Sequence, residues 1–74
     1  MGDILSTLAE NVKYYRSHLD LTQEELATRA GINRSYLAGI EAGRRNISAK
    51  TIERLAKALE VSPADLLKSL DTFQ

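Results

Sequence analysis

Residues 22–43, TQEELATRAGINRSYLAGIEAG, decide how this chain folds. The pattern predicts two short helices joined by a turn of about three residues at Gly31. Polar residues beginning with Arg34 and Ser35 lie on one face of the second helix, whereas Leu37 and Ile40 form its apolar face. Two helices joined in this way can place the second one in the major groove of DNA.

Four helix starts share one pattern in which a polar N-cap residue follows one apolar residue and precedes another by four positions. The four sets are Leu21, Thr22 and Leu26; Ile32, Asn33 and Leu37; Ile47, Ser48 and Ile52; Val61, Ser62 and Leu66. Gly31 and Gly43 stand where helix ends favour a left-handed residue. The sequence predicts helices at about residues 4–18, 23–30, 34–42, 49–59 and 63–71, with no sheet.

Apolar residues three and four positions apart give each expected helix one apolar stripe. The expected core residues are Leu8, Val12, Tyr15, Leu19, Leu26, Ala27, Ala30, Leu37, Ile40, Ile52, Leu55, Ala56, Leu59, Leu66, Leu67 and Leu70. With 74 residues and no cysteine, the chain is expected to form one all-α domain without a disulfide or a thiolate metal site. Nothing in it predicts a membrane span, and its acidic N-terminus excludes a signal peptide.

The net charge is zero, but its distribution is uneven. Residues 29–50 carry five basic side chains against Glu41 alone, a net charge of +4, whereas residues 1–28 sum to −3 and the remainder to −1. A polyanion responds to the field within about 10 Å, so the basic segment around the two-helix motif favours nucleic acid.

One charged residue borders the apolar face of the second motif helix. Glu41 follows Ile40 directly, and an unpaired buried carboxylate costs several kcal/mol. Arg16 lies at the edge of the first helix's stripe, so we expect an ion pair between Arg16 and Glu41; the alternative is that both are solvated.

Base-reading residues are expected on the outer face of the helix that begins at Arg34. Arg34 is the candidate for a bidentate bond to guanine, and Ser35 for a base or a phosphate. Gly39 is expected to contribute by leaving a smooth surface that lets the helix approach the bases closely. A glycine inside a helix is otherwise unfavourable by about 1 kcal/mol relative to alanine.

The remaining expected contacts go to the DNA backbone or minor groove. Gln23 offers a free amide at a helix N-terminus, and Tyr36 offers a hydroxyl at the groove wall, with partial packing as its alternative. The complete set is Thr22, Gln23, Asn33, Tyr36, Arg44, Arg45 and Asn46. Simple capping at Thr22 and a solvated loop at 44–46 are the alternatives.

The segments TQEELA, AGI, SYL and IEAG, together with LAKALEVSPADLL, resemble the Cro/repressor-type (XRE) helix-turn-helix family over about residues 8–70. The resemblance implies a five-helix lambda-repressor-like domain, a phosphate contact from Gln23, and pairing of Arg16 with Glu41. The run NRSYLAGIEAGRRNIS is similar to controller proteins of restriction–modification systems. That similarity implies DNA roles for Arg34, Ser35, Tyr36, Gly39, Arg45 and Asn46.

The sequence therefore predicts a transcriptional regulator that binds a palindromic DNA operator as a homodimer in a bacterial cytoplasm, encoded by a bacterium, phage or plasmid. The dimer interface is expected at Leu66, Leu67, Leu70 and Phe73 on the last helix and beyond it. RNA polymerase is a candidate partner, and no cofactor, metal or small-molecule ligand is expected. An antitoxin or other protein-interaction module with the same fold is the alternative, and a phage- or plasmid-type repressor is the nearest variant. An enzyme is disfavoured, because His18 is the single histidine and no nucleophile–base pair is apparent.

Overall fold

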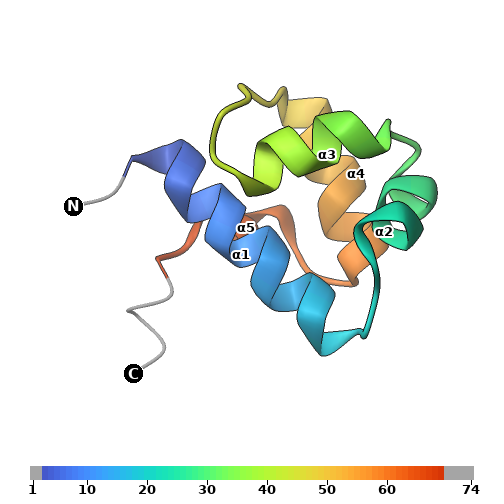
Figure 1. The fold of residues 1–74 in the computed structure, drawn as a ribbon. Coiled ribbons are helices and arrows are strands. Elements are labelled where there is room, and N and C mark those ends of the chain that lie inside the picture. Colours follow the sequence, from blue (N-terminus) through green and yellow to red (C-terminus); the bar gives the residue numbers. More distant parts are fainter. Residues whose placement is uncertain (1–2, 70–74) are drawn as a thin grey trace.

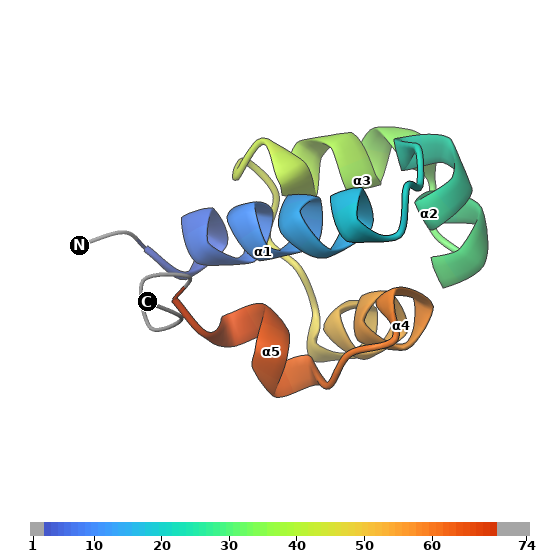
Figure 2. The ribbon, with the colours of Figure 1, turned by 90° about the horizontal axis from the view of Figure 1, so that it is seen from below.

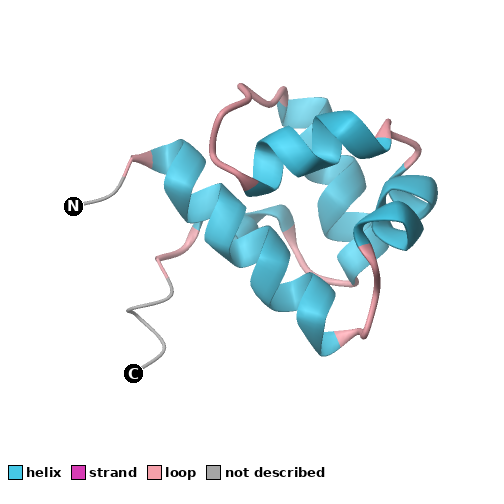
Figure 3. Cartoon of the chain, viewed as in Figure 1, coloured by secondary structure: helices cyan, strands magenta, loops and turns pink. Residues whose placement is uncertain are grey.

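Five helices and no strand make up residues 3–69, the part of the chain that the computed structural model describes (Figures 1 and 3). The helices are α1 (Ile4–His18), α2 (Gln23–Ala30), α3 (Arg34–Glu41), α4 (Ala49–Leu59) and α5 (Pro63–Leu67). The predicted all-α fold is confirmed. Within residues 3–69 no helix has the length and apolar character needed to cross a membrane.

Each of the four predicted N-caps accepts a hydrogen bond from its own helix. Thr22 and Ser62 form capping boxes with the residue three positions on, Asn33 accepts from Ser35 and Tyr36, and Ser48 accepts from Thr51. Asp3 caps α1 in the same way. These bonds satisfy backbone N–H groups that have no partner within the first turn of a helix, which is why the predicted starts are correct.

The helices form two layers, with α1 and α3 in one layer and α4 and α5 in the other (Figure 2). α2 closes one end by packing against α3 and α4, while α1 packs against both α3 and α5. The core between the layers consists of Leu8, Val12, Leu21, Leu26, Ala27, Ala30, Leu37, Ile40, Leu55, Ala56, Leu59 and Leu66. Tyr15, Leu19 and Ile52, predicted as core residues, are partly buried at its edge.

α5 is shorter than predicted, because its backbone becomes extended at Lys68 (φ −80°, ψ 140°). The buried Asn11 side chain of α1 donates through Nδ2 to the carbonyl oxygens of Leu66 and Lys68, each at 2.7 Å. In a continuing helix the Leu66 carbonyl would accept from the backbone four residues on. Asn11 takes that acceptor and thereby ends α5 against α1.

The two leucines of α5 have different environments, one in the core and one at the surface. Leu66 is fully buried, so its predicted place in a dimer interface is wrong: its side chain faces the protein's own core. Leu67 is 43% exposed, so its predicted core position is wrong, whereas an interface role remains open to it. Leu70 and Phe73 lie outside the described residues.

Burial and the nearby carboxylate of Asp65, with a smaller contribution from Tyr14, raise the pKa of Tyr15. Tyr15 belongs to α1 and Asp65 to α5, two helices that pack against each other.

Candidate nucleic-acid interface

α3 has one buried and one open face. Leu37, Ile40 and Glu41 are buried, whereas Arg34 and Ser35 at its N-terminus are exposed. The helical spacing of three and four residues aligns the buried side chains along one stripe, which leaves the first two residues pointing away from the core. Arg34 and Ser35, which were predicted to read bases, are therefore exposed to solvent on the outer face of α3.

Asn33 fixes the direction in which α3 starts. Its Oδ1 accepts from the backbone N–H groups of Ser35 at 2.7 Å and Tyr36 at 3.3 Å. The side-chain oxygen is therefore committed to capping, and a contact from Asn33 to DNA would come from its amide nitrogen. Arg34 follows as the first helical residue, with its side chain exposed.

The predicted ion pair between Arg16 and Glu41 is present. Arg16 Nε lies 2.8 Å from Glu41 Oε2, and Arg16 Nη2 lies 2.9 Å from Glu41 Oε1. Arg16 Nη1 also donates to the carbonyl oxygen of Leu21 at 2.8 Å. Arg16 thereby joins α1 to the turn before α2 and to the end of α3. Glu41 is only 4% exposed, and the two-point pair supplies the charge partner that its buried carboxylate needs.

Gln23 has a role that the sequence did not predict. Its Nε2 donates to Glu41 Oε1 at 3.0 Å, so the expected free amide is wrong. The bond ties the first residue of α2 to the last residue of α3 and fixes the two helices of the motif relative to each other. A phosphate contact by Gln23 stays a prediction, and it would have to share the side chain with Glu41.

The N-terminus of α2 is closed by a reciprocal pair of hydrogen bonds. Glu25 N donates to the Thr22 hydroxyl at 3.0 Å, and Thr22 N donates to Glu25 Oε1 at 2.8 Å. The bonds from the Thr22 backbone and side chain lower the pKa of Glu25. A shallow groove beside this N-terminus is lined by Arg16, Thr22, Gln23, Glu24 and Arg34. The structure thus brings the predicted contacts at 22–23 together with Arg34.

The loop after α3 forms the opposite flank of the motif. Gly43 adopts the left-handed conformation (φ 74°), and Arg44 N donates back to Gly39 O at 3.0 Å. The chain therefore turns back along α3 and places the Arg45 guanidinium carbon 5.1 Å from the centre of the Tyr36 ring. A second shallow groove here is lined by Ser35, Ala38, Gly39, Arg44 and Arg45.

Tyr36 has the partial packing that was given as its alternative role, and its contact with the DNA backbone stays a prediction. Its ring packs against the core, and its hydroxyl donates to the carbonyl oxygen of Asn46 at 3.4 Å. Asn46 and Arg44 are exposed in the same loop.

The stem of Arg45 lies over Gly39, where a smooth surface was predicted, and leaves this residue only partly exposed. A Cβ atom built on Gly39 would overlap Arg45 Cγ and lie 3.3 Å from Arg45 Cδ. The unusual position of a glycine inside a helix marked the site in the sequence, but nothing local pointed to a residue beyond the next turn as its neighbour.

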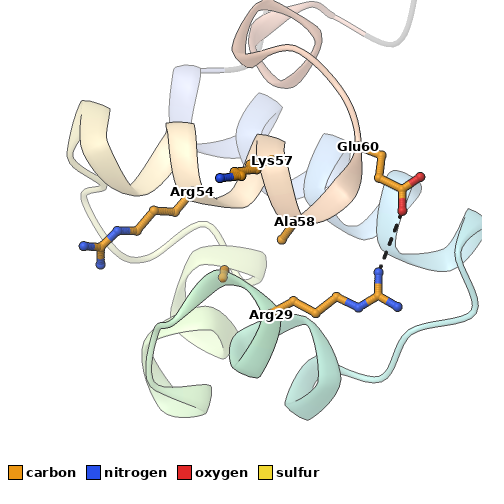
Figure 4. Close-up of a pocket in the computed structure, with 6 residues that line it drawn as sticks. Arg29, Arg54, Lys57, Ala58 and Glu60 are labelled. Atoms are coloured by element: carbon orange, nitrogen blue, oxygen red, sulfur yellow. Dashed lines mark ion pairs between the residues drawn. The ribbon is translucent and has the colours of Figure 1, made fainter.

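A further basic groove lies between α2 and α4, lined by Arg29, Ala30, Arg54, Lys57, Ala58 and Glu60 (Figure 4). Arg29 pairs with Glu60 across it at 3.9 Å, and both side chains are at least half exposed. No residue of α3 lines this groove, so its cations are separate from the face described above.

A helix-turn-helix family model (HTH_3) matches residues 12–66. The control protein C.SmaI of Serratia marcescens is 45% identical over 65 residues, which make up 88% of this chain and 77% of that protein.

Two solved structures have the same fold. The restriction–modification controller protein C.AhdI from Aeromonas hydrophila superposes with a TM-score of 0.81 at 39% identity, covering 84% of this chain and 94% of that one. The hypothetical transcription factor NHTF from Neisseria gives a TM-score of 0.93 at 35% identity, covering 96% and 82%. The predicted helix-turn-helix fold and the predicted resemblance to controller proteins are both confirmed.

Proposed function

Since the chain belongs to the helix-turn-helix family of non-enzymatic, DNA-binding transcription regulators, we propose that it controls a restriction–modification system by binding a palindromic operator as a homodimer. The similarity to controller proteins supports the choice of system. The observation that carries the proposal is the exposed N-terminal face of α3, with Arg34 and Ser35 outside and Leu37 and Ile40 buried behind them.

Arg34 is the proposed reader of a guanine. It is exposed, it starts the helix whose N-terminus enters the groove first, and its side chain is a fork of donors that matches guanine O6 and N7. A good bidentate pair contributes about 1–3 kcal/mol of discrimination against a wrong base. Ser35, one position on, would contact a base or a phosphate.

The DNA backbone would be held on both sides of α3. On one side lie Thr22 and Gln23 at the N-terminus of α2, in the groove that Arg34 also lines, where the arginine and the helix dipole favour a phosphate. On the other side stands the loop of Arg44, Arg45 and Asn46. Such contacts fix the register of the protein on the duplex without reading sequence.

Dimerisation is proposed because one module with one reading helix rarely finds a single site among genomic competitors. A two-fold dimer would read two half-sites separated by about 34–36 Å, one turn of DNA. The exposed Leu67 is the described residue we propose at the interface. Leu70 and Phe73 remain interface predictions from sequence.

Selection from random duplex DNA, repeated at several salt concentrations, tests this function. The wild type should enrich a palindrome, and its affinity should fall steeply as salt rises. Arg34→Ala should relax one position in each half-site. Arg54→Ala is the matched control, since it removes another exposed arginine, one that lies on α4, and should leave the selected motif unchanged.

Two results would contradict the proposal. If Arg34→Ala selected the wild-type motif, Arg34 would not be the reader. If the wild type enriched no sequence even at low salt, the chain would be a protein-interaction module instead. Sedimentation tests the dimer separately, and a monomer at tens of micromolar would exclude it.

A further inference from the structure

Arg45 lies across the outer surface of α3 in a defined position. The turn at Gly43 and the bond from Arg44 N to Gly39 O send the chain back toward the helix. The stem of Arg45 then passes over Gly39, and its guanidinium sits above the Tyr36 ring, 5.1 Å from the ring centre. One arginine is therefore held at two points of the helix that is proposed to enter DNA.

Gly39 makes this arrangement possible. Any Cβ there would overlap Arg45 Cγ, so even alanine would push the stem away. The α3 backbone at Gly39 is ordinary helix, where alanine is the better residue. The glycine is thus not required by its own backbone conformation, and the space taken by Arg45 is what accounts for it.

Tyr36 supplies the second point of support. Its ring lies under the Arg45 guanidinium, and the two groups attract each other by a cation–π interaction. Its hydroxyl donates to Asn46 O at 3.4 Å and ties the loop to the same ring.

We propose that Gly39 and Tyr36 form a seat that holds Arg45 ready to bind a DNA phosphate at the groove wall. The proposal rests on the proposed function and assigns Gly39 and Tyr36 as positioning residues. A long side chain that is already ordered loses less conformational freedom when it binds. Arg45 belongs to the loop after α3, which is proposed above to hold the DNA backbone, so its guanidinium above the Tyr36 ring would meet a phosphate and not a base. The contact should therefore strengthen binding to all sequences alike.

A double-mutant cycle between Gly39→Ala and Arg45→Ala tests the seat, with affinity measured on selected and on unrelated duplexes. Gly39→Ala leaves every charge in place and should raise the melting temperature or leave it unchanged. It should nevertheless weaken binding about 3- to 10-fold on both kinds of duplex. In the Arg45→Ala background, Gly39→Ala should have no further effect. Arg44→Ala is the matched background, where Gly39→Ala should keep its full effect.

Two outcomes of the cycle would overturn the seat. An equal loss in both backgrounds would mean that the new methyl group meets DNA itself. No loss in the wild-type background would mean that Arg45 needs no seat.

Nuclear magnetic resonance of the free protein tests the seat without DNA, so its failure is distinguishable from failure of the proposed function. The side-chain protons of Arg45 should be shifted upfield by the Tyr36 ring. The shift should persist in Tyr36→Phe, which keeps the ring, and disappear in Tyr36→Leu and Gly39→Ala. Arg45 shifts equal to those of Arg44 in the wild type would refute the proposal.

Discussion

An Arg16→Met variant is expected to lose about 3 kcal/mol or more of its unfolding free energy, because the change leaves the buried carboxylate of Glu41 without its cation. Methionine retains much of the aliphatic stem, so the loss reports mainly on charge and hydrogen bonding.

The magnitude follows from the geometry of the pair. Removing one member of a buried ion pair costs about 3–5 kcal/mol. The Glu41 side chain is 3% exposed, which favours the full cost, but that of Arg16 is 22% exposed, so solvent screening places the expectation near the lower limit. Gln23 remains as a neutral donor to Glu41, while the Leu21 carbonyl loses its bond from Arg16.

Urea unfolding followed by circular dichroism would measure the loss at equal protein concentrations. For a domain of this size each kcal/mol corresponds to about 4–8 °C in melting temperature, so thermal melts should fall by more than about 12 °C. Arg29→Met is the matched control, since its partner Glu60 lies 3.9 Å away with both side chains largely exposed. The control should lose less than about 1 kcal/mol.

A double variant strengthens the test. Arg16→Met combined with Glu41→Leu should recover part of the lost stability, because an apolar pair removes the stranded charge. Equal losses for Arg16→Met and Arg29→Met, both below about 1 kcal/mol, would refute the reasoning that burial makes this pair important.

Three further changes have defined outcomes. Asn11→Leu should cost about 1–3 kcal/mol in urea unfolding, because the carbonyls of Leu66 and Lys68 lose their donor; Glu10→Leu, at an exposed position of α1, should cost much less. Glu25→Gln should flatten the acid side of the stability–pH curve, because it removes the carboxyl group whose pKa the Thr22 hydrogen bonds lower. Because hydrogen bonds from Thr22 lower the folded-state pKa of Glu25 below the usual 4.5, the ionised carboxylate stabilises the wild type above pH 4.5, and this contribution is lost as the pH falls through the folded-state pKa. Urea unfolding at a series of pH values measures it, and stability curves that fall in parallel for the variant and the wild type would show that the capping box contributes nothing. Leu67→Glu should shift the dimer toward monomer in sedimentation with no change in helical content, since the side chain is 43% exposed in the protomer; an unchanged dimer would place the interface elsewhere.

The helices could be predicted because their signals are local. Thr22, Asn33, Ser48 and Ser62 each bind N–H groups two or three residues ahead, so the cap and its helix are read from one short window. The end of α5 could not be read in this way. The residue that stops it, Asn11, is 55 positions from Leu66, and only the packing of α1 on α5 brings them together.

The features of the proposed DNA interface also fall into those that local sequence predicts and those that depend on tertiary packing. Exposure of Arg34 and Ser35 follows from helical periodicity, and the pairing of Arg16 with Glu41 from the position of each beside an apolar stripe. The bond from Gln23 to Glu41 and the covering of Gly39 by Arg45 depend on how α2 and the loop after α3 are folded onto α3.

Local sequence patterns alone thus predict five helices, four of them with their N-caps, a buried stripe on each, and a cationic motif with an outward-facing arginine, because each of these depends on neighbours within about one helical turn. Which polar groups are free to meet a ligand is decided only in three dimensions. Gln23 is partly engaged, Leu66 is enclosed and Arg45 is held in place because their partners come from other elements, and packing has to bring those elements together before the bonds can form.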